Sequence, residues 1–224
     1  ALSCFLPSIA STLEALDLRD TCIDTVGMRA LSLPLVLFGR LTELNLRENE
    51  LGDESAVYLA ETITAGMTSL THLDLRCNWI TNVGAAALGQ ALGKSAPSIR
   101  ILRLSSNVMG ETGSRDLAIG LLPCCKLEKI GLSGNTMRDG AAPALAALFR
   151  RQVNLRSLNL SRNLFEIYGA QTIAVALGGL PRLEKLLIRE NHWGDDGRRA
   201  FQQALSWNLG LRLEDADGPK QAAS

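Results

Sequence analysis

The sequence predicts an α/β fold: a curved solenoid (horseshoe) with a parallel β-sheet on the concave face and α-helices on the convex face. Two observations carry this prediction. A leucine-rich stretch with strand spacing recurs every 28 or 29 residues, starting at Leu13, Leu41, Leu70, Ile99, Leu127, Leu155 and Leu183. Between these stretches, apolar residues recur at i and i+4, which is the spacing of one helix face. We therefore expect about seven full repeats, each made of a strand, a loop and a helix.

The repeat from Leu70 to Leu92 shows each element most clearly. Leu73 and Leu75 alternate with polar residues, as expected for a strand with one buried face. Leu88 and Leu92 then lie on one face of the following helix, and we expect them to pack against the strand leucines. Because helices are about 10 Å wide and strands are spaced about 4.8 Å apart, a stack of such units must curve with the strands inside.

An asparagine follows the strand in every repeat except the first, where Thr21 takes its place. The asparagines are Asn49, Asn78, Asn107, Asn135, Asn163 and Asn191. An amide side chain both donates and accepts hydrogen bonds, so a column of buried asparagines can satisfy the backbone of the loops.

This L-x-x-L-x-L-x-x-N pattern with a 28- or 29-residue period resembles the leucine-rich repeat, and its length resembles the ribonuclease-inhibitor-like class found in intracellular proteins. The resemblance extends from Leu13 to about Leu205. It implies the curved fold described above.

The chain divides into a repeat domain, residues 1–213, and a polar C-terminal tail, residues 214–224. Residues 1–12 read as the end of an earlier repeat, because Leu2 and Leu6 stand before Leu13 as Leu88 and Leu92 stand before Ile99. Residues 205–213 contain a degenerate last strand, in which Leu209 or Leu211 takes the first leucine position. We expect a further repeat or domain before Ala1, so that the chain is part of a larger chain or a multi-subunit assembly.

Composition narrows the class of partner. Lys plus Arg and Asp plus Glu both number 23, so the formal net charge is zero and does not favour nucleic acid or a membrane as partner. Five cysteines without metal-site spacing predict free thiols and an intracellular, cytoplasmic location. No motif of a phosphate loop, dinucleotide site, zinc site or serine nucleophile is present, so we predict no enzymatic activity, no cofactor and no metal.

The candidate binding residues lie on the concave face, in three columns that point away from the helices. Solenoids use this face for protein partners. The candidates also include Trp79, in the loop after Asn78. The full set is Asp17, Arg19, Glu43, Asn45, Arg47, His72, Asp74, Arg76, Trp79, Arg103, Lys129, Asn159, Lys185 and Arg189.

Two interpretations of the charged columns remain open. Arg19, Arg47 and Arg76 form a ladder beside Asp17, Asn45 and Asp74, and the two columns could simply neutralise each other. Alternatively, they specify half of a binding surface. Phe165 and Trp193 fall in an apolar column and are predicted to be core residues, whereas Trp79 falls one position earlier and is predicted to be partly exposed.

These features predict a non-catalytic protein–protein interaction module or scaffold that binds a protein on its concave face. One alternative is a GTPase-activating protein, because the Ran GTPase-activating protein shares this repeat class. Another is the ligand-sensing end of a nucleotide-binding innate-immune receptor, or a subunit of a ciliary or other assembly. Ribonuclease inhibitor itself alternates two repeat types and is rich in cysteine, and neither feature is seen in this sequence.

Overall fold

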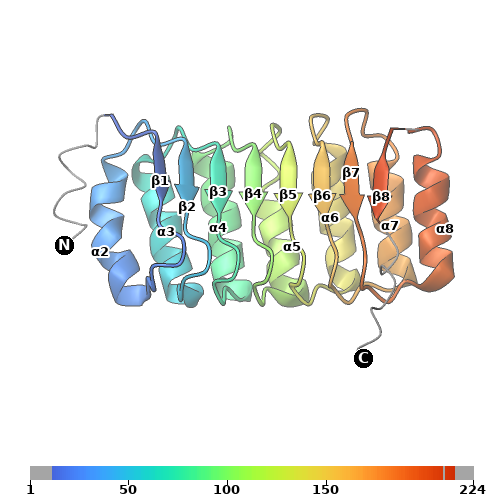
Figure 1. Cartoon of the computed structure of the whole chain (residues 1–224), viewed down its shortest axis with the longest axis horizontal. Coiled ribbons are helices and arrows are strands. Elements are labelled where there is room, and N and C mark those ends of the chain that lie inside the picture. The colour runs from blue at the N-terminus through green and yellow to red at the C-terminus, as the bar shows by residue number, and fades with distance from the viewer. Residues whose placement is uncertain (1–11, 209, 215–224) are drawn as a thin grey trace, which may run out of the picture.

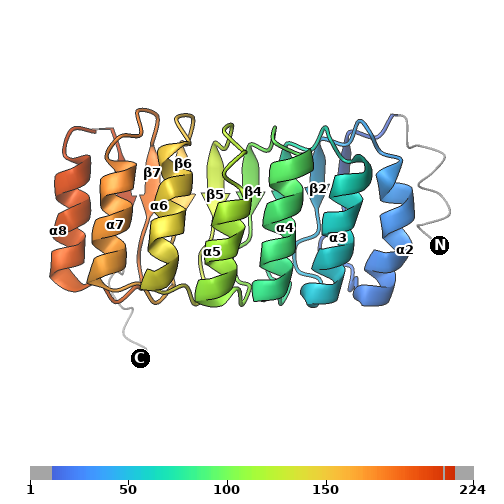
Figure 2. The ribbon, with the colours of Figure 1, turned by 180° about the vertical axis from the view of Figure 1, so that it is seen from behind.

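The computed structural model describes residues 12–208 and 210–214, and it confirms the predicted solenoid. Eight strands form one parallel sheet in the order β1 to β8. The sheet forms one layer and the helices form the other (Figures 1 and 2). The strands are β1 (Ala15–Asp17), β2 (Glu43–Asn45), β3 (His72–Asp74), β4 (Ile101–Arg103), β5 (Lys129–Gly131), β6 (Ser157–Asn159), β7 (Lys185–Leu187) and β8 (Arg212–Glu214). The helices are α2 (Thr25–Val36), α3 (Gly52–Gly66), α4 (Asn82–Ser95), α5 (Gly110–Gly120), the 3-10 turn η2 (Asp139–Ala141), α6 (Ala142–Arg150), α7 (Ile167–Leu177) and α8 (Gly194–Leu205).

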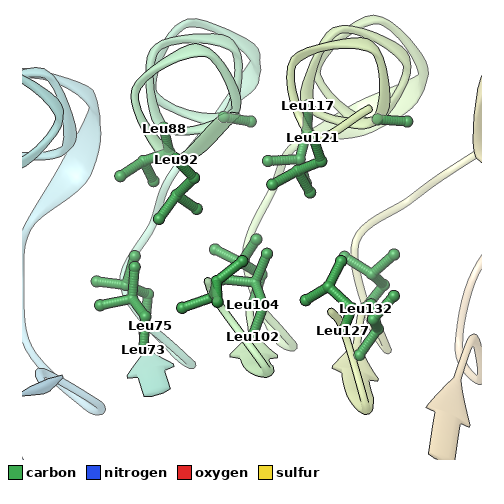
Figure 3. Close-up of a cluster of buried hydrophobic side chains, with 14 of the residues drawn as sticks. Leu73, Leu75, Leu88, Leu92, Leu102, Leu104, Leu117, Leu121, Leu127 and Leu132 are labelled. Carbon is green, nitrogen blue, oxygen red and sulfur yellow. The ribbon is translucent and has the colours of Figure 1, made fainter. Parts of the chain in front are cut away.

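The core lies between the two layers and is built as the repeat pattern predicts. Figure 3 shows Leu88 and Leu92 of α4 pointing toward Leu73 and Leu75, with the next coils repeating the arrangement. All four of these leucines are at most 1% exposed. The strand register also follows the predicted alignment, with Leu73 opposite Leu102 and Leu44 opposite Leu73.

The asparagines form the predicted ladder. Asn107 Nδ2 donates to the carbonyl oxygens of Leu75 and Leu104, both at 2.9 Å, and Oδ1 accepts the N–H groups of Asn78 (3.1 Å) and Ile80 (3.0 Å). One amide therefore satisfies backbone groups in two neighbouring coils. In the first repeat, the Thr21 hydroxyl donates to Leu18 O (2.7 Å) and replaces one of these bonds.

Six of the seven strand-to-helix loops in the described residues have one of two conformations, and the loop of the sixth repeat has no left-handed residue after its asparagine. In the first, third and fifth repeats the residue after the asparagine position is left-handed: Cys22 (φ 53°), Trp79 (φ 57°) and Thr136 (φ 53°). In the second, fourth and seventh repeats the left-handed residue lies two positions later and is a glycine: Gly52, Gly110 and Gly194. Over the first five repeats the two forms alternate, although repeat length does not.

The loop form decides how well the next asparagine is satisfied. Gly52 N–H donates to the backbone carbonyl of Asn78 (2.9 Å), and Gly110 N–H donates to that of Asn135 (3.0 Å). The side-chain Oδ1 atoms of Asn78 and Asn135 are buried without a hydrogen-bond partner. The ladder is thus complete at Asn107 and incomplete at its two neighbours.

The last strand corrects the predicted register. β8 pairs with β7 so that Leu213 lies opposite Leu186. This register places Gly210, rather than Leu209 or Leu211, at the first leucine position, and it extends the sheet to Glu214. Leu209 lies outside the described residues, as do residues 1–11 and 215–224, on which the predicted preceding repeat and polar tail fall.

Candidate functional site

The concave face is the surface of the sheet opposite the helices, and the strand register aligns its side chains in columns. Ala15, Glu43, His72, Ile101, Lys129, Ser157, Lys185 and Arg212 form one column. Asp17, Asn45, Asp74, Arg103, Gly131, Asn159 and Leu187 form the next. These columns are as predicted, and Arg212 adds a basic residue that could not be assigned while the last register was open.

The Asp/Asn column has a structural role that sequence reasoning missed. The carbonyl oxygens at the strand ends accept hydrogen bonds from the ladder asparagines; Leu46 O, for example, accepts from both Asn49 and Asn78. The N–H groups at the strand ends have a different partner, and the N–H of Arg76 donates to Asp74 Oδ1 at 3.2 Å. The same bond, from residue i+2 to the side chain of residue i, recurs from Arg19 to Asp17, from Arg47 to Asn45 and from Ser161 to Asn159. A short acceptor in this column therefore binds the backbone at the end of β1, β2, β3 and β6.

Asp74 is the centre of the charged part of the face. Its side chain is 7% exposed, and Arg76 Nε lies 2.9 Å from Oδ1 and 3.0 Å from Oδ2, while Nη2 lies 2.5 Å from Oδ2. Arg103 Nη1, from the next strand, lies 3.4 Å from Oδ2. Asp74 thus forms ion pairs with two arginines, and its contact with Arg76 is bidentate.

The electrostatics of this cluster follow from its geometry. Burial raises the pKa of Asp74, but the hydrogen bonds from Arg76 and the charges of Arg76 and Arg103 outweigh it, so the net pKa is lowered. The hydrogen bond to Asp74 raises the pKa of Arg76 in turn. The carboxylate is therefore ionised at neutral pH, and its charge is balanced within the sheet.

The other two arginines of the predicted ladder have acidic neighbours as well. Arg19 Nε lies 3.4 Å from Asp17 Oδ2, and Arg47 Nη2 lies 2.5 Å from Glu48 Oε1. Pairing with acids supports the neutralising interpretation of the ladder. These pairs are substantially exposed and contribute about 0–1 kcal/mol each.

A depression of about 310 Å³ gathers the residues of β1 to β4. It brings together six of the predicted residues with Ile101, and the core leucines of its lining, Leu44 and Leu73, are each only 1% exposed. Its lining is Ala15, Leu16, Asp17, Glu43, Leu44, Asn45, His72, Leu73, Asp74, Ile101 and Arg103. Ile101 was not predicted as a binding residue because the candidates were chosen for charged, polar or aromatic side chains. Its column nevertheless places it on this face.

Among the three acids of this depression, Glu43 differs because its ionic neighbour is a histidine and not an arginine. Asp74 is balanced by two arginines, and Asp17 has Arg19. Glu43 is 58% exposed at its side chain, and its ionic neighbour is His72, with Nδ1 at 3.8 Å from Oε1. His72 Nδ1 is also 2.8 Å from the Thr71 hydroxyl. Glu43 thus offers negative charge at the mouth of the depression.

The predicted basic residues of the other half lie apart from this depression. Lys129 and Lys185 line a second depression of about 550 Å³ with Arg156, Ser157, Glu184, Gly210 and Arg212. Asn159 and Arg189 line neither of these two depressions. The concave face therefore carries two separate polar regions, and the small residues Gly131 and Ser133 lie between them.

Trp79 lies at the edge of the solenoid where the helices begin, and not on the sheet. It is 71% exposed, whereas Phe165 and Trp193 are 0% and 4% exposed, as predicted for core residues. Trp193 stacks on Phe165 with ring centroids 6.1 Å apart and meets Phe201 edge-on at 5.2 Å. A left-handed backbone is uncommon for a bulky residue and costs about 1–2 kcal/mol, so the fold holds this indole outward at an energetic cost.

Over the parts of the chain that the structure describes, no group of histidine, cysteine and carboxylate side chains is placed to hold a metal ion. Within the same ranges, the helices are too short or too polar to cross a lipid bilayer. Cys22, Cys77, Cys124 and Cys125 are free thiols. Burial raises the pKa of Cys124 to about 12, which keeps this thiol protonated.

Comparison with known proteins supports the assignment of the repeats. A family model described as "Leucine Rich repeat" matches residues 10–32, 41–60 and 66–89. The ribonuclease inhibitor of Sus scrofa is 34% identical over 138 residues, which is 61% of this chain and 30% of that protein. NACHT, LRR and PYD domains-containing protein 3 of Mus musculus is 31% identical over 159 residues, 70% of this chain and 15% of that protein.

Among solved structures, internalin C2 of Listeria monocytogenes has the same type of fold. It superposes with a TM-score of 0.60 at 20% identity, covering 97% of this chain and 77% of that chain. The present chain spans less than a third of the length of either curated relative.

Proposed function

The chain is a leucine-rich-repeat protein of the ribonuclease-inhibitor-like class, and we propose that it is a non-catalytic module that binds a protein partner on its concave face. The depression around Asp74 is the observation that supports this proposal. It is the place where polar side chains from four strands converge around Ile101 in a hollow of the concave face. A hollow with a few fixed polar groups is typical of recognition sites.

The charge at the depression indicates the chemistry of the partner. The acid Glu43 is exposed at its mouth, while the Asp74 carboxylate is already paired with Arg76 and Arg103. We therefore propose that a lysine or arginine side chain of the partner enters the depression and meets Glu43. Complementary charge of this kind contributes specificity and association rate more than affinity.

Trp79 is a proposed anchor at the rim of the same surface. Val108, in the equivalent position of the next coil, and Val83, four residues after Trp79, are also exposed, at 44% and 55%. Exposed tryptophans that become buried in complexes often carry a large share of binding energy.

A second candidate is the ligand-sensing end of a larger receptor; it is favoured by the similarity to NACHT, LRR and PYD domains-containing protein 3 of Mus musculus, whose name gives other domains beside the repeats. This candidate uses the same concave face and differs in what the rest of the protein does. We also propose that the module acts inside the cell, since the described cysteines are free thiols.

Site-specific photocrosslinking tests the proposed face. A photoreactive amino acid at Ile101, in the depression, should capture a partner from an extract of the source cells, whereas the same group at Val175, which is 69% exposed on α7, should not. Purified partner should then bind Glu43→Lys at least about tenfold more weakly than wild type. Capture from Val175 alone, or an unchanged affinity of Glu43→Lys, would contradict the proposal. Faster GTP hydrolysis by a captured GTPase would instead support the GTPase-activating alternative.

A further inference from the structure

A second surface runs along the edge where the helices end, which is the upper edge in Figures 1 and 2. We define this helix-end edge as the segments that connect each helix to the following strand. The chain is neutral as a whole, but its charges are not evenly placed. The cations on this edge, including those in the last helical turns, are Arg40, Lys94, Arg100, Lys126, Arg150, Arg151, Arg156 and Arg182, against the acids Glu14, Glu128 and Glu184.

The three acids are each taken by one arginine of an adjoining coil. Arg40 pairs with Glu14 at 3.1 Å, Arg100 with Glu128 at 3.3 Å and Arg156 with Glu184 at 2.5 Å. These three pairs include all of the acids of this edge in the described residues. The other cations of the edge therefore have no acidic partner within its described part.

Three of the remaining cations are held by neutral acceptors on the preceding coil. Lys126 Nζ lies 3.4 Å from Ser98 Oγ, Arg151 Nε donates to Leu122 O at 3.0 Å, and Arg182 Nη1 donates to Asn154 Oδ1 at 2.8 Å. These bonds orient the side chains along the edge without cancelling their charge. Lys94 and Arg150 lie in last helical turns, where the helix dipole explains a cation; Lys126 and Arg182 lie beyond the helices, where it does not.

An apolar row runs between these cations. Pro97, Cys125, Val153 and Pro181 occupy equivalent positions 28 residues apart, and all four are exposed. Val153 is 54% exposed, between Arg151 and Asn154 in the sequence. The edge thus presents a line of small apolar side chains over four successive coils, each with at least one cation within three residues in the sequence.

From this row and its cations we propose that the helix-end edge binds an extended, acidic segment of a partner protein whose apolar residues alternate with carboxylates. In an extended chain, alternate side chains recur about every 6.6–6.8 Å. Neighbouring coils are spaced between about 4.8 Å at the strands and about 10 Å at the helices, so one apolar residue per coil matches this repeat. The row lacks the bulky Trp, Phe or Leu side chains that enter a membrane interface, which favours a peptide over a lipid surface.

Binding of a defined probe tests the proposal independently of the concave face. The probe is a fluorescein-labelled decapeptide of alternating glutamate and valine, measured by fluorescence anisotropy at about 50 mM and 300 mM salt. We expect binding at low salt that weakens at high salt because exposed charges are screened. A glutamate–serine decapeptide should bind more weakly than the glutamate–valine decapeptide, and a lysine–valine decapeptide should not bind.

Charge reversal locates the site. Lys126→Glu/Arg150→Glu/Arg182→Glu should lower the affinity at least about tenfold. Arg29→Glu/Arg138→Glu/Arg198→Glu changes the net charge equally at three exposed arginines off this edge and should bind like wild type. Val153→Ser should weaken the glutamate–valine probe and leave the glutamate–serine probe unchanged. Circular dichroism of each variant establishes that it is folded, and a misfolded triple variant would be replaced by the three single reversals.

Several outcomes would overturn the proposal: no binding of the glutamate–valine probe at low salt, or equal weakening in both triple variants. Binding of phosphatidylserine vesicles or of a single-stranded oligonucleotide that is tighter than the peptide and lost in the edge variant would assign the edge to a different class of partner. A loss of binding in Lys129→Glu alone would place the peptide on the concave face instead.

Discussion

Removing the Arg76 side chain should destabilise the protein through Asp74. In Arg76→Ala, the backbone N–H of residue 76 still donates to Asp74 Oδ1, and Arg103 Nη1 remains at 3.4 Å from Oδ2. The bidentate contacts at 2.9 Å and 3.0 Å and the contact at 2.5 Å are lost. A carboxylate with 7% of its side-chain surface exposed then keeps its desolvation cost and loses its main partner.

The expected loss of stability lies between two limits. Exposed ion pairs contribute about 0–1 kcal/mol, and breaking a fully buried pair costs about 3–5 kcal/mol. The Arg76 side chain is 32% exposed, and the depression beside Asp74 admits water, so an intermediate cost of about 2 kcal/mol is expected.

The direction in which the stability changes with pH follows from the lowered pKa of Asp74. The pKa of Asp74 is lowered in the folded protein, so its ionisation contributes stability that is fully present above the unfolded pKa of about 3.9 and is lost as the pH falls through the folded pKa. Without Arg76, desolvation is less well opposed and the folded pKa rises. The stability difference between wild type and Arg76→Ala should therefore be constant above about pH 5 and should narrow below about pH 4.

Urea unfolding followed by circular dichroism measures the difference, and coincidence with the fluorescence transition tests two-state behaviour, which stacked repeats do not guarantee. A double-mutant cycle with Asp74→Asn is the control, because asparagine keeps the local acceptor for the N–H of residue 76. In the Asp74→Asn background, loss of Arg76 should cost less than about 1 kcal/mol and should not depend on pH. A loss below about 0.5 kcal/mol in the wild-type background, or the same loss at pH 3 and pH 7, would refute the reasoning.

Three further perturbations separate structure from function. Asn107→Ala removes a complete set of hydrogen bonds and should cost about 1–2 kcal/mol more in urea unfolding than Asn135→Ala, whose Oδ1 has no partner; equal costs would contradict the described ladder. Trp79→Gly should raise the stability by about 1 kcal/mol, because glycine tolerates φ 57°, while it weakens partner binding; a variant that is less stable would show that the indole supports the fold. Gly93→Ala would overlap a carbonyl oxygen of the neighbouring helix and should cost more than about 3 kcal/mol, whereas Gly52→Ala, with open space but φ 62°, should cost about 1 kcal/mol by the same assay.

Much of this surface could be predicted without coordinates, but its connections could not. The columns that contain Glu43, Asp74 and Arg103 follow from the repeat period once the strands are placed. Which of them pair does not follow, because partners such as Asp74 and Arg103 lie 29 residues apart and meet through side-chain conformations that a period does not specify. Trp79 was predicted to lie partly exposed in the edge loop after Asn78, and the structure places it there; the left-handed backbone that holds it outward depends on the loop form, which the repeat period does not specify.

The sequence by itself determined the repeat architecture, the strand register up to β7 and the buried residues, including Phe165 and Trp193. The physical reason is that each strand and each helix must bury one apolar face. This requirement recurs in every coil, so the same residue pattern appears in all seven repeats. Only the tertiary structure decided the two loop forms, the register of β8, the depression around Asp74 and the apolar row along the helix-end edge. These features depend on hydrogen bonds, ion pairs and packing between neighbouring coils. Such contacts join residues that are distant in the chain and are not specified by the repeat period.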